Sequence, residues 1–120
     1  MTFLILGGGV AGRSNNSEKV FQDALLRWQQ GDLPAAEKKL KSILKRQPTY
    51  INALYHLGVL KHQTGVDKRA LELLQRTLKL APNFGAAHFS FALVLLAQGD
   101  REGAREHFQL TLRYSPDLHK

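Results

Sequence analysis

A spacing of 34 residues runs through the sequence and constrains its fold more than any other feature. Glycine recurs at Gly31, Gly65 and Gly99. Three further residue types recur at the same interval, as Ala36, Ala70 and Ala104, as Leu44, Leu78 and Leu112, and as Pro48, Pro82 and Pro116. A fixed period of this length indicates one supersecondary unit repeated along the chain, with each copy packed on its neighbours. The 120 residues therefore contain three units, at residues 17–50, 51–84 and 85–118.

The second unit shows how each copy is expected to fold. Leu54 and Leu57 mark the buried face of a first helix, and Gly65 lies just after its last turn, where a left-handed residue ends a helix at little steric cost. A second helix is predicted from about Lys68. Pro82 ends it, because proline cannot continue a helix and disfavours helical geometry in the preceding residue. Apart from the first few residues, no stretch alternates with the period of two typical of a strand, which predicts an all-α fold.

The repeat resembles the tetratricopeptide repeat, which has a large residue, Leu and Gly in its first helix, Ala-x3-Phe in its second helix and a closing Pro. The residues that match are Leu54, Leu57, Gly58, Ala70, Leu74 and Pro82 in the second unit, Phe91, Ala92, Leu95, Ala104, Phe108 and Pro116 in the third, and Ala36, Leu40 and Pro48 in the first. The first unit departs from the pattern at Asp23 and Arg27, which stand at normally apolar positions. The resemblance implies a right-handed α-solenoid of three antiparallel helix pairs over residues 17–118.

The resemblance also implies a place for a partner. Proteins of this family generally bind an extended peptide or a helix in a concave groove lined by the first helices of the pairs. The matching positions are Phe21, Gln22, Leu25, Trp28 and Gln29 in the first unit, Asn52, Tyr55, His56, Val59, His62 and Gln63 in the second, and Phe89, Ser90, Leu93 and Leu96 in the third. Phe21, Tyr55 and Phe89 occupy equivalent positions and predict an aromatic row, whose rings either contact a partner or pack between helices.

Two partner classes of the family do not fit this groove. The carboxylate clamp of chaperone-binding relatives needs Lys, Asn and Arg at positions where this chain has Gln, His and Ser. An asparagine ladder is also missing, with Asn52 as a single rung. The predicted groove is therefore neutral and partly aromatic.

The two ends of the repeat array differ in character. Asp23 and Arg27 are four residues apart and can pair on a solvated helix face, which suits a terminal repeat. The last helix instead holds residues that a following repeat would normally cover, namely Phe108, Leu110, Leu112 and Tyr114. This pattern predicts self-association through the last helix, cover by a partner, or a longer natural array.

The first sixteen residues precede the repeats and are predicted to form a flexible N-terminal tail, as residues 119–120 form the C-terminal end. Gly7, Gly9 and Gly12 satisfy G-x-G-x-x-G after a short strand-like run, a pattern typical of dinucleotide-binding turns. Such a site needs a helix that begins at the glycines and leads to a second parallel strand. Residues 15–17 (Asn-Asn-Ser) instead predict a loop and a helix cap, so we expect no cofactor.

Positive charge is concentrated away from the predicted groove. The chain has 17 Lys and Arg against 10 Asp and Glu, a formal charge of +7. The basic residues cluster on the second helices as Lys38, Lys39, Lys41, Lys45 and Arg46, and less densely as Lys68, Arg69, Arg76 and Lys79. Such a face is either a solvated surface or a docking surface for nucleic acid, anionic lipid or an acidic protein. No aromatic residue stands among these basic residues to stack on bases, so we expect no specific nucleic-acid partner.

Several classes of chemistry are excluded or not indicated. The absence of cysteine rules out disulfides, iron–sulfur clusters and thiol nucleophiles. Common catalytic motifs are missing, and His56 and His62 lie six residues apart, a spacing that does not place two metal ligands on one helix stripe. His88 stands at a packing position, and His107 and His119 have no evident partners. We therefore expect no enzyme and no metal site.

The most direct interpretation is a protein-interaction adaptor that recognises a peptide or helix. No apolar run approaches the ~20 residues needed to cross a bilayer, and the basic start of a signal peptide is missing, so we expect a cytoplasmic protein without a membrane span. Two alternatives to the adaptor stay open. In the first, the chain is the interaction segment of a larger glycosyl- or sulfotransferase-type enzyme. In the second, it is a structural module that forms homo-oligomers.

Overall fold

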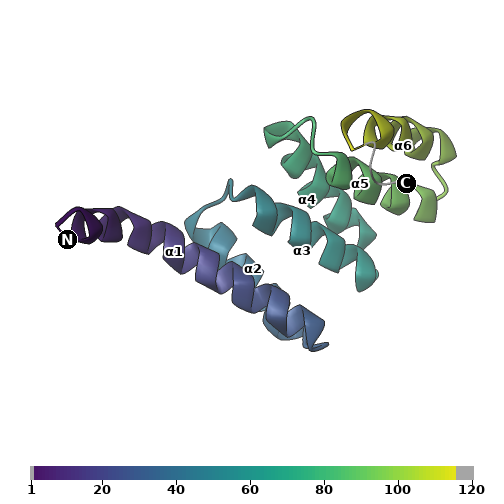
Figure 1. Ribbon diagram of the computed structural model, residues 1–120. Helices are drawn as coiled ribbons and strands as arrows, with labels where there is room; N and C mark the ends of the chain where they lie inside the picture. Colours follow the sequence, from purple (N-terminus) through teal and green to yellow (C-terminus); the bar gives the residue numbers. More distant parts are fainter. Residues whose placement is uncertain (1, 116–120) are drawn as a thin grey trace. The chain divides into compact units, whose positions relative to one another are not determined.

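Six α-helices make up the part of the chain that the structure describes. The computed structural model describes the backbone of residues 2–115 and the side chains of residues 16–115, and no strand occurs in that range. The helices are α1 (Thr2–Gln29), α2 (Leu33–Arg46), α3 (Ile51–Gln63), α4 (Asp67–Leu80), α5 (Gly85–Ala97) and α6 (Arg101–Tyr114) (Figure 1). Helices α2, α4 and α6 begin 34 residues apart, as do α3 and α5. The predicted all-α fold of three helix pairs is confirmed.

The first helix begins earlier than the sequence predicts. Helix α1 runs without a break from Thr2, so the predicted strand-like run and the predicted loop and cap at residues 15–17 are wrong. Asn and Ser inside a helix cost only up to about 0.7 kcal/mol each relative to alanine, which does not force a helix to end. Gly7, Gly9 and Gly12 therefore lie in a helix and follow no strand within residues 2–115. The flexibility assigned to this segment stays a prediction.

Each helix pair turns at one of the periodic glycines. Gly31, Gly65 and Gly99 have φ of 82°, 83° and 89°, in the left-handed region that glycine enters without steric penalty. The amide after each glycine donates to the carbonyl five residues earlier, as Asp32 does to Arg27 at 2.9 Å. This is the Schellman motif of a helix end. It confirms that Gly65 closes the first helix of its unit.

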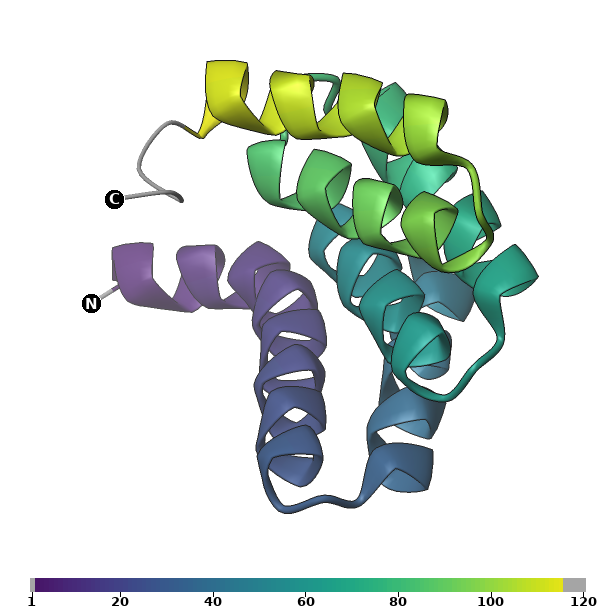
Figure 2. The same cartoon turned by 90° about the vertical axis from the view of Figure 1, so that its right-hand side faces the viewer.

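The chain divides between Pro48 and Thr49 into two units. The first unit contains α1 and α2, which lie side by side and antiparallel (Figure 2). Ala24 on α1 and Ala36, Leu40 and Ile43 on α2 are buried. The small residues at 24 and 36 allow the two backbones to approach closely.

The second unit contains α3 to α6. Helix α3 packs on α4, α4 on α5 and α5 on α6, and α3 also touches α5. A core cluster of Ala70, Leu74, Phe91 and Val94 joins α4 to α5. Gly58 on α3 faces Leu74, because a Cβ built at Gly58 would lie 2.9 Å from Leu74 Cγ. The buried faces thus follow the apolar spacing of the sequence.

Helix α4 has no side-chain cap at its N-terminus, unlike α2 and α6, the second helices of the other two pairs. Asp32 at the start of α2 and Asp100 at the start of α6 accept hydrogen bonds from the amides of Ala35 and Gly103 at 3.2 and 2.9 Å. Val66 occupies the same place before α4, is 44% exposed and offers no acceptor. Its φ of −100° is close to the −88° and −87° of the two aspartates.

We therefore expect Val66→Asp to raise the free energy of unfolding by about 1 kcal/mol, since an aspartate there can accept the free amide of the first turn. Urea denaturation followed by circular dichroism measures the change. Val66→Ala is the matched control and gives no such gain. An unchanged or lower midpoint for Val66→Asp would contradict the capping argument.

Candidate functional site

An apolar stripe is exposed along α5. Phe89, Leu93 and Leu96 follow the spacing i, i+4, i+7 and so share one face of the helix. Their exposed fractions are 41%, 36% and 47%. Helix α5 contains no Asp, Glu, Lys or Arg, so no charge interrupts these three residues, which we call the α5 stripe. A single exposed leucine is ordinary, but three large apolar side chains in line are typical of an interaction surface.

Helix α3 presents the equivalent positions beside it. Tyr55, Val59 and His62 precede the α5 stripe by 34 residues and are each half-buried. The Tyr55 side chain packs against the core cluster of the second unit, and its ring centroid lies 4.9 Å from that of Phe84. Because α3 and α5 touch, a more polar row lies on the helix next to the apolar one.

The polar groups of α3 are held by local hydrogen bonds. His56 Nδ1 lies 2.8 Å from the carbonyl oxygen of Asn52, which can only accept, so the ring nitrogen donates. His62 Nδ1 lies 2.8 Å from Asp67 Oδ1. Burial lowers the pKa of His56, and the bond to Asn52 opposes that effect. His56 is therefore mainly uncharged at neutral pH. The Asn52 and Gln63 side chains of the same helix are exposed.

The predicted aromatic row has three different environments. Phe21 on α1 is 5% exposed and so is a packing residue, Tyr55 is half-buried, and Phe89 is exposed. The other predicted groove residues of α1 lie in the first unit, with Leu25 and Trp28 half-buried and Gln22 and Gln29 exposed. Ser90, beside Phe89, is half-buried. Of the three rings, Phe89 offers the most surface to a partner.

The residues predicted to form an oligomer interface lie on α6. Leu112 and Tyr114 are 51% and 40% exposed, while Phe108 and Leu110 are half-buried. The ring of Phe108 lies 5.8 Å from that of Phe89. The α5 stripe and the predicted α6 interface therefore meet at this pair of rings.

A histidine pair joins α5 to α6. His88 is 5% exposed, which confirms its packing position, and its Nε2 lies 2.7 Å from the carbonyl oxygen of Pro82. His88 must donate there, so the neutral ring accepts at Nδ1 from Nδ1 of His107, 3.0 Å away. The expectation that His107 has no partner is wrong, because only the packing of α5 on α6 brings these residues together. His119 lies outside the described residues.

This pair gives the stability of the second unit a pH dependence. Burial, followed by the proximity of His88, lowers the pKa of His107, and Glu106 raises it by less. The unfolded chain then binds more protons than the folded one below the ordinary histidine pKa of about 6.5. Stability is complete above that pH and falls as the pH drops toward the folded-state pKa. His56 contributes in the same direction.

We expect the thermal midpoint to be lower at about pH 5 than at about pH 7.5, a window in which lowered histidine pKa values act and carboxylates remain mostly ionised. The difference should shrink in His107→Gln and shrink further when His56→Gln is added. The readout is the change of the thermal midpoint with pH, so a substitution that lowers the midpoint equally at every pH does not affect the result. An identical slope in the double variant would refute the assignment.

Ion pairs on the first unit extend what the sequence predicts. The pairing of Asp23 with Arg27 is confirmed, at 3.7 Å between Oδ1 and Nε. A shorter contact joins Asp23 Oδ2 to Lys39 Nζ at 2.7 Å, across from α1 to α2. The hydrogen bond from Lys39 is the main cause that lowers the pKa of Asp23.

Among the side chains that the structure describes, no three His, Cys, Asp or Glu residues gather as metal ligands. In the described helices, no segment combines the length and apolar character needed to cross a bilayer.

Known families and proteins match this chain over its repeats. Two models described as tetratricopeptide repeat match residues 27–88 and 68–118. The protein O-mannosyl-transferase TMTC3 of Homo sapiens is 28% identical over 101 residues, which cover 82% of this chain and 11% of that protein. The cellulose synthase 2 operon protein C of Komagataeibacter xylinus is 38% identical over 82 residues, which cover 68% of this chain and 6% of that protein. The chain thus spans only a small part of these relatives.

Solved structures match most of this chain. A mutant of the Thermobaculum terrenum O-GlcNAc transferase matches with a TM-score of 0.85 and 27% identity, over 88% of this chain and 20% of that one. MamA matches with a TM-score of 0.77 and 22% identity, over 86% of this chain and 60% of that one. At this identity the likeness concerns the fold and not the function. The fold class is the all-α solenoid. Because the two repeat models together match residues 27–118, the chain belongs to the tetratricopeptide repeat family, whose repeats are generally protein-interaction modules.

Proposed function

We propose that this chain is an adaptor that binds a segment of a partner protein on the α3 and α5 face of its second unit. The α5 stripe is the observation that supports this function most directly. Its three side chains are large, apolar, aligned and exposed. Burial of such side chains is the main source of favourable free energy in protein association.

The spacing of the stripe favours a helical or extended ligand. Phe89 and Leu96 are seven residues apart, about 10 Å along the helix axis. An amphipathic helix with apolar residues at i, i+3, i+4 and i+7 matches that length. The neighbouring row on α3 adds hydrogen-bonding groups through Tyr55 and His62, and Asn52 and Gln63 lie exposed at its ends. The partner segment is thus apolar on one side and uncharged where it meets α3.

Residues of α1 are proposed as a second, smaller contact area. Trp28 and Leu25 are half-buried, and Gln22 and Gln29 expose amide groups. An indole ring with neighbouring amides provides large contact area together with polar contacts. Phe21 is left out of this area because it is buried.

Selection from a peptide library tests the proposed function. A library of random helical peptides is selected on the wild type, after depletion on a variant with the α5 stripe replaced by Phe89→Ser, Leu93→Ser and Leu96→Ser. Peptides that survive should share apolar residues at helical spacing. Selection of no peptide, or of peptides without a common apolar face, would contradict the proposal. Circular dichroism establishes that the depletion variant is folded.

A second candidate is that the chain is the interaction segment of a larger enzyme. It covers 20% and 11% of two proteins named as transferases. An antibody against the repeats distinguishes the two cases in a native extract. A band far above 13.5 kDa supports the larger enzyme, and a band near that mass supports the adaptor alone.

Self-association is the third candidate and uses the exposed part of α6. Leu112 and Tyr114 would be buried between two copies. Light scattering over a range of protein concentrations should then show a rising mass for the wild type and a constant monomer for Leu112→Lys. A constant monomer mass in both proteins excludes this candidate.

A further inference from the structure

A basic hollow lies between α1 and α2 in the first unit. Its volume is about 430 Å³, and the residues that line it are Val20, Arg27, Ala35, Lys38, Lys39 and Ser42. Three of these side chains are cations, whereas Val20 and Ala35 give the hollow aliphatic walls. The Ser42 hydroxyl donates to the carbonyl of Lys39 at 2.7 Å, so its hydrogen is already used.

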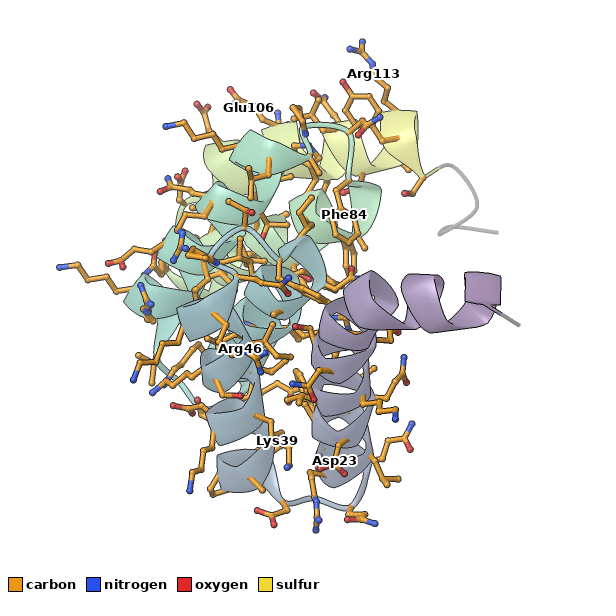
Figure 3. The ribbon with its side chains drawn as sticks, turned by 90° about the vertical axis from the view of Figure 1, so that its left-hand side faces the viewer. Asp23, Lys39, Arg46, Phe84, Glu106 and Arg113 are labelled. Atoms are coloured by element: carbon orange, nitrogen blue, oxygen red, sulfur yellow. The ribbon has the colours of Figure 1, made fainter. Side chains whose placement is uncertain are left out.

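Two of the three cations that line the hollow already pair with a carboxylate of the chain itself, which lies at the edge of the lining set rather than in it. Asp23 Oδ2 lies 2.7 Å from Lys39 Nζ, and its Oδ1 lies 3.7 Å from Arg27 Nε. Figure 3 shows Asp23 and Lys39 directed toward each other from the two helices. Charge-assisted bonds of this kind are the stronger hydrogen bonds of proteins. Asp23 is thus an internal ligand of two of the three cations.

Positive charge remains after that pairing. Lys38 is exposed and makes no ion pair with another residue among those whose side chains are described. Three cations around one carboxylate leave a formal excess of two positive charges. Lys41 differs, because its Nζ is paired with Glu37 at 2.7 Å. Lys45, on the same helix, does not line the hollow.

We propose that this hollow binds an acidic segment of a partner protein. A Glu or Asp carboxylate of the segment pairs with Lys38 and Lys39, and a neighbouring aliphatic side chain packs on Val20 and Ala35. Asp23 competes for Lys39 and so weakens binding. The aliphatic walls favour a protein over a nucleic acid, since a sugar–phosphate backbone gains nothing from them. This site is independent of the α5 stripe, which lies on the other unit.

The test uses the whole chain and a short fluorescent peptide that alternates Glu and Leu. Fluorescence anisotropy measures the binding of the peptide at about 0.15 M salt, where long-range attraction is screened. Lys38→Gln with Lys39→Gln should weaken binding about tenfold or more, as expected when close charge pairs are lost. Asp23→Asn should strengthen it several-fold. Lys45→Gln with Arg46→Gln, a matched loss of two charges from exposed residues of the same helix that do not line the hollow, should stay within about twofold, which is the scale of general screened attraction. Circular dichroism shows that each variant is folded.

Three results would overturn the proposal. The first is equal weakening by the Lys45→Gln, Arg46→Gln variant and by the Lys38→Gln, Lys39→Gln variant, which would indicate general charge attraction. The second is unchanged or weaker binding of the peptide to the Asp23→Asn variant, which would show that Asp23 does not compete with the peptide for Lys39. The third is tighter binding of a short single-stranded DNA than of the Glu-Leu peptide. A control peptide with Gln in place of Glu should not bind.

Discussion

Leu74→Ala should destabilise the second unit by about 2–5 kcal/mol, the usual cost of truncating a buried leucine. Leu74 is fully buried where α4 meets α5, in contact with the cluster of Ala70, Phe91 and Val94. Packed helix pairs relax only partly into the cavity that the truncation leaves. Since small domains are stable by about 5–15 kcal/mol, this loss is a large share of the total. Urea denaturation of both proteins measures it.

A second substitution makes this prediction specific. A methyl group at Gly58 would lie 2.9 Å from Leu74 Cγ and 3.4 Å from Leu73 Cβ. In the wild type, that close contact opposes the stabilisation of about 1 kcal/mol that alanine gives a helix relative to glycine. After Leu74→Ala the close contact is gone, and the methyl group enters the cavity. Gly58→Ala should therefore stabilise the Leu74→Ala variant by more than it stabilises the wild type.

A double-mutant cycle over these two sites should give a coupling of about 0.5–3 kcal/mol, the range found for residues in contact. Ala24 and Ala92 stand at the positions equivalent to Gly58 in the other two repeats and are fully buried, so a methyl group can be packed at this repeat position. Purely additive effects of Gly58→Ala and Leu74→Ala would mean that α3 and α4 are not packed as described.

Leu93→Asp should lower the affinity for a selected peptide by about tenfold or more, because it places a carboxylate at the centre of the apolar contact. Leu93 lies between Phe89 and Leu96 on the α5 stripe and is 36% exposed. Circular dichroism establishes that the Leu93→Asp variant is folded. Anisotropy titration of the labelled peptide measures the loss. Gln75→Asp, on the exposed side of α4, is the matched control and should change affinity by less than about twofold. Equal affinity of wild type and Leu93→Asp would exclude the stripe as the site.

Most of the fold is predictable because the signals repeat. Gly65 ends its helix for the same steric reason as Gly31 and Gly99, so three copies support one interpretation. The start of α4 at Asp67 lies one residue from the predicted Lys68. The extent of α1 is different, because nothing repeats before residue 17. Local preferences of Asn and Ser are too small there to decide between a cap and a continuing helix.

The site is less predictable because it depends on neighbours. Tyr55 and Phe89 occupy one repeat position, yet Tyr55 packs near Phe84 and the core whereas the Phe89 ring meets Phe108 on α6. Repeat phase predicts which helix face a residue occupies but does not predict how much of it remains exposed. The contact between His88 and His107 likewise joins residues on different helices, as does the contact between Asp23 and Lys39, and no spacing rule of a single helix predicts such contacts.

Site-specific photo-crosslinking tests the central claim most directly. A photoreactive amino acid replaces Leu93 in one protein and Gln75 in another, and each is irradiated in a nuclease-treated native extract. The account predicts a discrete protein adduct at position 93, absent at position 75, that disappears when a selected peptide is added in excess. No adduct at position 93, or the same adduct at both positions, would contradict it.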